Sequence, residues 1–485
     1  MRGFVHRIIQ GTGNILAEEF YKNIEKNKVK TFDSLYSRNV TSKDKEKNYV
    51  IKTDRKSLVR IITAYNLGRQ VDLPDILCSE MMPVPLALAE INGLLKSGDK
   101  AVLQRRLLEN IVCTESIDLN GKFSCLLIDG QGLVVSIDKT NCKIFGDLAD
   151  HFIRTMLWHG NVCERIDLIF DRYRDNSIKE STRNQRTKKQ RAIRKDISGR
   201  EIPVPQNWTN FLACPKNKSD CADFLSKQIK LKETFSKVIV TSGGFNDELE
   251  VWSSKDNIDI TKLSSTHEEA DNRLILHAIN CEQKYIIVQS KDTDVLVLLI
   301  SLFYKINCIE LWMKAGTKKN PKFIPVHDVV NSISPTILKS LIPFHTLTGC
   351  DTTSFIAQHT KWSAWKTLLS HSHLIEHLGE NDNLEDTEYK NIEKFFCILY
   401  GIPNEDNIDK VRYHLFLKKN KPDALPPTSD ALYLHIKRAH YQSLIWKKAD
   451  CPRPIIPDPT NYGWETTDTG LKPILMTKEG IPMMH

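Results

Sequence analysis

Residues 285–300 read YIIVQSKDTDVLVLLI, two apolar runs on either side of a short polar segment. The first run is β-branched and aromatic and too short for a typical helix, so it predicts a short buried strand. The second run follows Ser, Asp and Thr, residues that cap helices, and predicts the start of a buried helix. Asp292 and Asp294 would lie at the carboxyl end of a strand, where open parallel sheets bind ligands. Like charges this close predict either a metal site or a helix cap.

Three earlier apolar runs also have the character of strands. They are FSCLLIDG (123–130), RIDLIFDRYRD (165–175) and SKVIVTSGG (236–244). Because strands alternate with helical segments from about residue 121, the sequence predicts an α/β domain with a central, largely parallel sheet flanked by helices. Strands that end at Asp129, Asp171 and Asp292 would gather their carboxylates at one edge of that sheet.

Two further acidic clusters fall in the same region. STHEEADNRLILHA (265–278) predicts a helix with Glu269 and Asp271 in its first turn, and HTLTGCDTTSF (345–355) places Asp351 in a turn of small residues. Taken singly, each acid has an ordinary role as a cap, a turn residue or a partner of the helix dipole. His267 and His345, which stand beside these clusters, are interpreted as local hydrogen-bonding residues.

Taken together, the acids predict a divalent metal site, because so many carboxylates at one edge repel one another without cations. The predicted ligands are Asp129, Asp171, Glu269, Asp271, Asp292, Asp294 and Asp351. Hard oxygen donors without supporting His or Cys ligands suit Mg²⁺ or Mn²⁺. Two such ions ~3.5–4 Å apart are the usual device for cleaving phosphodiesters.

The motifs LLIDG, LIFDRYRDNSIKESTR, EEAD, SKDTD and GCDTT resemble, in order and spacing, the flap-endonuclease-like branch of the PIN nuclease superfamily. The resemblance covers residues 121–370 and implies that the seven acids bind two Mg²⁺ ions. It also implies that Lys179 and Arg183 contact the scissile phosphate. HEEAD and LTGCDTTS are similar, in addition, to a group of multi-copy invertebrate proteins.

Three features depart from that family. First, FIAQHTKWSAW (355–365) lacks the glycines that let a hairpin approach duplex backbone. Second, Asp271 stands where the family has Glu. Third, some 120 residues precede Asp129, whereas the catalytic domain of the family begins near the N-terminus. A nuclease-fold protein that binds nucleic acid with weakened or no turnover is therefore the alternative. A third hypothesis takes DTDVL (292–296) as the nucleophile motif of a haloacid-dehalogenase-type phosphatase.

A basic stretch, KESTRNQRTKKQRAIRK (179–195), lies between Asp171 and Glu269. It predicts contact with a phosphate backbone, a nuclear localisation signal or a solvated charge run. The residues predicted to bind nucleic acid, DNA rather than RNA, are Arg186, Lys188, Lys189, Arg191, Arg194 and Lys195. The net charge of +8 suits a polyanionic partner.

Composition also bears on the compartment. The twelve cysteines form no C-x-x-C pair and are interpreted as reduced residues of an intracellular, nuclear protein. No apolar run is long enough to span a bilayer, so no membrane partner is expected.

The domain organisation follows from the same patterns. Residues 1–120 are predicted to be mainly helical, 121–370 to form the α/β domain and 371–420 a helical extension. Residues 421–485 hold nine of the twenty prolines and are predicted to form an extended tail.

Overall fold

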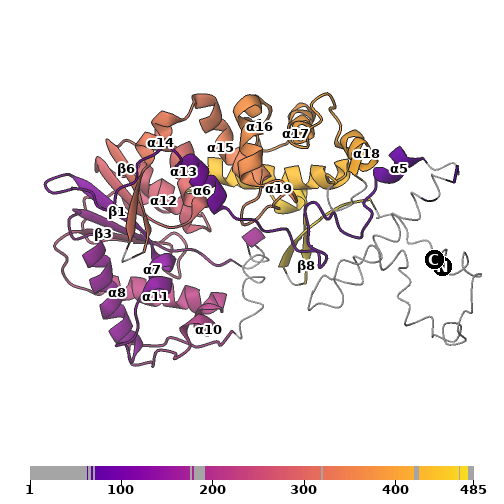
Figure 1. Cartoon of the computed structure of the whole chain (residues 1–485). Coiled ribbons are helices and arrows are strands. Elements are labelled where there is room, and N and C mark those ends of the chain that lie inside the picture. The colour runs from indigo at the N-terminus through magenta and orange to yellow at the C-terminus, as the bar shows by residue number, and fades with distance from the viewer. Residues whose placement is uncertain are drawn as a thin grey trace, which may run out of the picture. The chain divides into compact units, whose positions relative to one another are not determined.

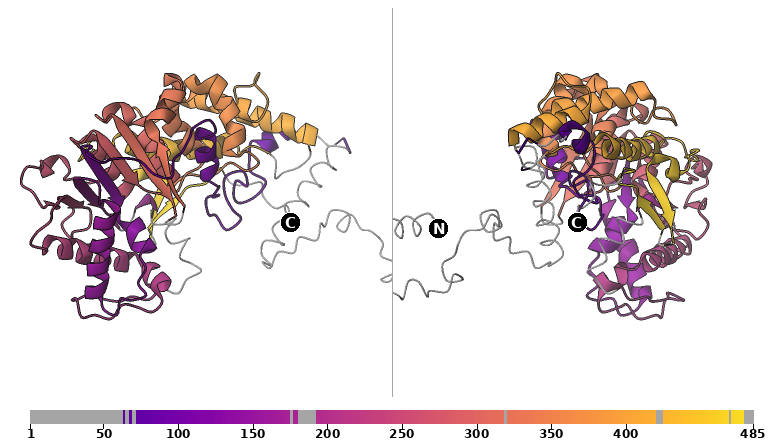
Figure 2. Two further views of the ribbon diagram at one scale, coloured as in Figure 1. Left: turned by 60° about the vertical axis from the view of Figure 1, so that its left-hand side comes forward. Right: turned by 90° about the vertical axis from the view of Figure 1, so that its right-hand side faces the viewer.

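The computed structural model describes residues 63, 67–68, 72–174, 177–179, 192–317, 320–419, 425–468 and 470–478. Its centre is a seven-stranded sheet with helices on both faces (Figures 1 and 2). This confirms the predicted α/β fold. The strands of the sheet are β1 (Ser124–Asp129), β2 (Arg165–Ile169), β3 (Val238–Ser242), β4 (Val251–Ser253), β5 (Tyr285–Gln289), β6 (Glu310–Gly316) and β7 (Pro321–Pro325).

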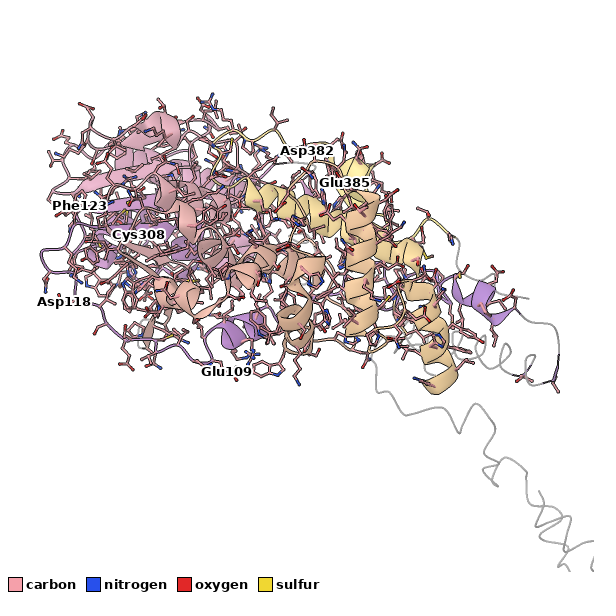
Figure 3. All side chains as sticks on the ribbon, turned by 90° about the horizontal axis from the view of Figure 1, so that it is seen from above. Glu109, Asp118, Phe123, Cys308, Asp382 and Glu385 are labelled. Carbon is pink, nitrogen blue, oxygen red and sulfur yellow. The ribbon has the colours of Figure 1, made fainter. Side chains whose placement is uncertain are left out.

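The strand order is β4-β3-β2-β1-β5-β6-β7. The neighbours from β3 to β6 pair in parallel, whereas β4 and β7 are antiparallel edge strands. The order reverses at β1, which pairs with β2 on one side and β5 on the other. Ligands of open α/β sheets bind outside the carboxyl ends of the strands at such a reversal. The opposite, amino edge is marked in Figure 3 by Phe123 and Cys308, which precede β1 and β6.

One face of the sheet packs on helices from the first half of the domain. These are α7 (Gly130–Ser136), α8 (Phe145–His159), α10 (Trp208–Leu212) and α11 (Pro215–Lys230). The core here includes Phe145, Phe152, Phe170 and Phe211, all buried. Leu126 and Ile128 of β1 join this core because alternate strand residues point to the same face.

The other face is covered by α12 (Ala270–Ile279), α13 (Thr293–Ser301) and α14 (Val326–Ser332), as Figure 1 shows. In α13 every residue from Thr293 to Ile300 is buried. Its apolar sequence is therefore a core segment enclosed on all sides, as a helix that is hydrophobic all round must be.

The remaining helices follow in the chain, and the first of them, α15, packs on α13. They are α15 (Pro335–Leu347), α16 (Lys361–His371), α17 (Asp386–Leu399), α18 (Ile408–Lys419) and α19 (Ser429–Lys447), followed by the hairpin β8 (Trp464–Thr467) and β9 (Gly470–Pro473). Short 3-10 helices span Ile260–Lys262, Phe303–Lys305, Ser372–Leu374 and Pro459–Tyr462. Helix α19 is largely buried and packs on α15. The expectation of an extended tail is therefore wrong for residues 429–447.

The described part of the region before the sheet, residues 72–120, holds the short helices α5 (Leu73–Leu77) and α6 (Ala101–Leu107) and is otherwise irregular. Here the structure differs from the mainly helical segment that was expected. Its loops instead bond to the α/β domain, as in the pair Phe355 N to Lys96 O (2.8 Å). Among the residues that the structure describes, no helix is long and apolar enough to cross a membrane.

Candidate metal site at the carboxyl edge of the sheet

Asp129 ends β1 at the reversal of strand order. It caps α7, since its Oδ1 atom accepts a hydrogen bond from Gly132 N at 2.9 Å. Its neighbour across the sheet in β2 is Ile169, which places Asp171 just beyond the same edge. Burial and the like charge of Asp171 raise the pKa of Asp129 to about 7. Asp129 therefore lies in an environment that favours a cation or a proton.

Asp171 connects this edge to the start of α12. Its Oδ1 atom accepts a hydrogen bond from Ala270 N at 2.7 Å, and Arg172 N donates to Glu268 O at 2.7 Å. These two bonds fix the first turn of α12 beside the end of β2. Glu269 and Asp271, on either side of Ala270, are thereby carried to the same edge.

Asp292 and Asp294 lie at the start of α13, directly after β5. Asp292 caps the helix by accepting from Asp294 N at 3.0 Å. Asp294 is fully buried, and its Oδ1 atom is 2.7 Å from Nε2 of His345 on α15. The His345 ring stacks on Trp446 of α19, with 5.7 Å between ring centroids. Of the two predicted roles, metal ligand and helix cap, the cap is present at Asp292.

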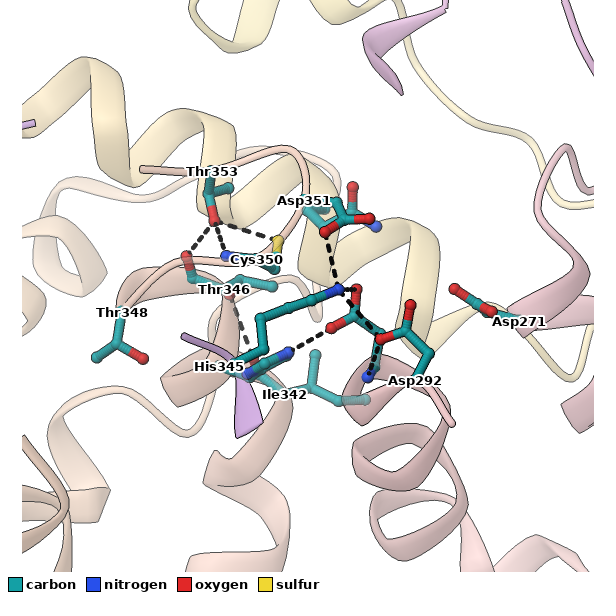
Figure 4. A network of polar contacts seen from close by, with 12 residues as sticks. Asp271, Asp292, Ile342, His345, Thr346, Thr348, Cys350, Asp351 and Thr353 are labelled. Carbon is teal, nitrogen blue, oxygen red and sulfur yellow. Dashed lines mark hydrogen bonds and ion pairs between the residues drawn. The ribbon is translucent and has the colours of Figure 1, made fainter. Parts of the chain in front are cut away.

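Asp351 lies in a turn held by hydrogen bonds within the turn. Thr353 Oγ1 donates to Thr346 O at 2.6 Å and accepts from Cys350 N at 3.1 Å. Gly349 has φ +106°, and an added Cβ would lie 2.8 Å from Phe355 N. Only glycine fits this conformation and this close approach. Figure 4 shows Asp351 and Asp292 facing a common centre, with Asp271 to one side.

The acids that were predicted as metal ligands lie at or just beyond the ends of β1, β2 and β5, at the start of α12 and in the turn after α15. One carboxylate oxygen each from Asp271, Asp292 and Asp294 lie within 4.8 Å of one another. Burial and the nearby acids Asp292, Glu269 and Asp171 raise the pKa of Asp271 well above its ordinary value, although Lys179 acts against them. Crowded oxygen donors of this kind fit a hard divalent cation such as Mg²⁺ or Mn²⁺.

Two lysines lie among these carboxylates. The Nζ atom of Lys179 is 2.6 Å from Oε2 of Glu269 and 3.7 Å from Oδ2 of Asp271. The Nζ atom of Lys100 lies 3.1, 2.9 and 2.8 Å from oxygens of Asp292, Asp294 and Asp351. Burial alone would lower the pKa of Lys100, but the three carboxylates outweigh it and raise that pKa. The negative charge of the acids around Lys100 is therefore already balanced in part by its ammonium group.

Lys100 was not anticipated from the sequence. It lies 192 positions before Asp292, in a region where no chemistry was expected, and its sequence context carries no motif. Lys361 was missed as well. It is buried beneath the site and donates to His345 O at 3.0 Å and to Thr348 Oγ1 at 2.7 Å.

The basic stretch falls largely outside the described residues. That holds for Arg183, Arg186, Lys188, Lys189 and Arg191. Besides Lys179, its basic residues Arg194 and Lys195 are described. Arg194 pairs with Asp220 of α11 at 2.5 Å and donates to Asn217 Oδ1 at 2.7 Å, and the backbone N–H of Lys195 donates to the same oxygen at 3.1 Å. Both residues thus fasten the end of this stretch to α11.

Comparisons with protein-family models and with curated proteins found no match. Two solved structures are similar at low identity. One is the bacteriophage T5 D15 flap endonuclease in a pseudo-enzyme-product complex with DNA and metal ions. The sequence identity is 12% and the TM-score is 0.32, and the match covers 67% of this chain and 99% of that chain. The other is the catalytic core of Rad2 in complex with a DNA substrate, with 12% identity, TM-score 0.30, and coverages of 64% and 91%.

Proposed function

We propose that this protein is a Mg²⁺- or Mn²⁺-dependent nuclease that hydrolyses phosphodiester bonds in single-stranded or branched nucleic acid, DNA rather than RNA. The observation that carries the proposal is that Asp271, Asp292 and Asp294, at the starts of α12 and α13, have carboxylate oxygens within 4.8 Å of one another beside the switch point of the sheet. A bound ion would activate water and stabilise the leaving oxygen. The nuclear location expected from the basic stretch belongs to the same proposal.

The chain's own residues would contribute in distinct ways. Asp271 and Asp292 would supply hard oxygen donors within 4.8 Å of each other, and Asp129 and Asp171 lie at or just beyond the ends of β1 and β2 on the same edge of the sheet. Lys179 holds Glu269 at 2.6 Å and so orients the first turn of α12. Lys179 thereby neutralises acids at this edge, and contact with the scissile phosphate is the further role that the family resemblance implies for it. Arg183, its proposed partner, lies outside the described residues.

A second candidate is a nucleic-acid-binding protein with weak or no turnover. The loop that departs from the family by lacking glycine is tied to the chain itself. Ala357 N donates to Ala87 O at 2.9 Å and Phe355 N to Lys96 O at 2.8 Å. These two N–H groups are engaged within the protein, so they do not grip a phosphate backbone.

The phosphatase hypothesis is the weakest of the three. It requires Asp294 to be a protonated general acid. Although burial alone would raise its pKa, Lys100 and His345 together lower it below the ordinary value. An ionised, fully buried carboxylate does not donate a proton.

The test is cleavage of labelled flap, duplex and single-stranded DNA and RNA by the purified full chain in Mg²⁺, Mn²⁺ or EDTA. Asp271→Asn should lower the rate by about 100-fold or more, because it removes an oxygen donor without changing shape. The matched control is Asp328→Asn on α14, whose side chain is 59% exposed. Salt-dependent binding without metal-dependent cleavage would favour the second candidate, and equal cleavage by all variants would contradict the proposal.

A further inference from the structure

We propose that the ammonium group of Lys100 takes the place of the second divalent ion, so that this site holds one ion instead of the two that its carboxylates would suggest. The inference rests on the proposed function in assuming that the site uses divalent ions. It concerns the three acids Asp292, Asp294 and Asp351, each of which forms an ion pair with Lys100.

The geometry makes Lys100 and an ion at these acids mutually exclusive. The ammonium has three N–H donors, and it has three carboxylate partners at 3.1, 2.9 and 2.8 Å. Mg²⁺ binds carboxylate oxygens at about 2.0–2.1 Å and demands octahedral geometry. An ion bound to the same three residues would have to occupy the space that Nζ fills.

The backbone before Lys100 is docked on the turn that carries Asp351. Phe355 N donates to Lys96 O, and Lys96 N donates to Leu88 O at 3.0 Å. Gly98 sits against the Phe355 ring so closely that an added Cβ would lie 2.3 Å from its Cδ2 atom. The segment that precedes Lys100 is therefore packed against the turn that carries Asp351, and this packing positions Lys100 beside the acids.

The chain after Lys100 is equally well anchored. Lys100 directly precedes α6, which packs on α13 and α16 (Figure 1). Leu103 and Leu107 are buried in that contact, and the Arg106 guanidinium lies 4.8 Å above the Trp362 ring. The backbone at Lys100 is therefore held on both sides, and its three ion pairs hold the ammonium among the acids.

The acids on the other side of Asp292 have Lys179 as a nearby cation, but it lies closest to Glu269, at 2.6 Å. An oxygen of Asp271 lies within 4.8 Å of oxygens of Asp292 and Asp294. Lys179 approaches Asp271 no closer than 3.7 Å. A single divalent ion would therefore be stabilised at Asp271 and Asp292, with Asp292 adjoining both the ion and Lys100.

The experiment counts bound Mn²⁺ by electron paramagnetic resonance on the full chain. We expect one ion per chain for the wild type and two for Lys100→Gln, which removes the charge. Lys100→Arg keeps the charge and should bind one ion, and Lys100→Gln combined with Asp351→Asn should return to one. The matched control is Lys96→Gln in the same segment, because Lys96 is also 20% exposed but pairs with Glu90.

Equal ion counts for the wild type and Lys100→Gln would overturn the inference. Should Lys100→Gln be too unstable to titrate without metal, its melting temperature must rise more with Mn²⁺ than that of the wild type; an equal rise would count against the inference. Nuclease activity is scored separately. An increase from one to two bound ions in Lys100→Gln, without cleavage by either protein, would uphold the role of Lys100 and refute the proposed nuclease. Cleavage with unchanged ion counts would uphold the nuclease and refute the role of Lys100.

Discussion

The Nζ atom of Lys100 lies 2.9 Å from Oδ2 of Asp294, although 194 positions separate the two residues. The other oxygen of Asp294 is held by His345 at 2.7 Å. A fully buried carboxylate is thus compensated on one side by the segment before the sheet and on the other by α15. This pairing ties the irregular region around residues 85–100 to the chemistry of the sheet edge.

Removing the Lys100 charge should destabilise the metal-free protein. In EDTA we expect Lys100→Gln to lower the free energy of unfolding by on the order of 3 kcal/mol, because three acids are left without their partner. Urea denaturation measures this. Lys96→Gln breaks only the more exposed pair with Glu90 and should cost less than about 1 kcal/mol. Equal losses for the two variants would show that the Lys100 cluster carries no special stability.

Stability should depend on pH through Asp129. Its pKa is raised from 3.8 in the unfolded chain to about 7 in the fold, so its contribution is present below about pH 4 and is lost as pH rises to about 7. In metal-free protein, the melting temperature of the wild type should therefore fall relative to Asp129→Asn over this interval. Parallel curves for the two proteins would contradict the raised pKa.

A buried network beneath the site should be sensitive to loss of one member. Arg165 holds Asp167 through two bonds of 2.7 Å, and Asp167 is 2.7 Å from Nδ1 of His277 on α12. Asp167→Asn leaves the Arg165 charge buried without its partner, so we expect a loss of about 3–5 kcal/mol in urea denaturation. The exposed pair Arg200–Asp150 is the control, and Asp150→Asn should cost at most about 1 kcal/mol.

The turn before Asp351 should not tolerate a side chain. Gly349 and Gly401 both have positive φ, +106° and +83°, but only Gly349 is crowded, by Phe355. Gly401→Ala should cost about 1–2 kcal/mol for the backbone conformation alone. Gly349→Ala should cost more in thermal or urea denaturation and also weaken Mn²⁺ binding in the Lys100→Gln background, because Asp351 shifts. A smaller cost at Gly349 than at Gly401 would contradict the described turn.

Strands of the sheet could be predicted because each of them is encoded by a short local run of apolar residues. The runs ending at Asp129, Asp171 and Asp292 are short, apolar and end in polar residues, so these strands could be recognised from the sequence. Parallel strands place their carboxyl ends at one edge, which is why the acids could be grouped from the sequence alone.

Helix α19 and Lys100 were not predictable, for different reasons. In α19 the residues His435, Arg438 and Gln442 are buried, so its sequence shows no apolar stripe. Their partners lie far along the chain, as in His435 Nε2 to Leu347 O (2.8 Å) and Thr352 Oγ1 to Gln442 Oε1 (2.6 Å). Lys100 likewise acquires its role only through contacts across nearly 200 positions, and no local pattern encodes such contacts.

The most direct test of the account is the location of a bound ion. A crystal of the full chain soaked in Mn²⁺ and measured at the manganese edge should show one anomalous peak beside Asp271 and Asp292, with Lys100 still on Asp294 and Asp351. Absence of a peak at these acids, or one in which the ion has displaced Lys100, would contradict it.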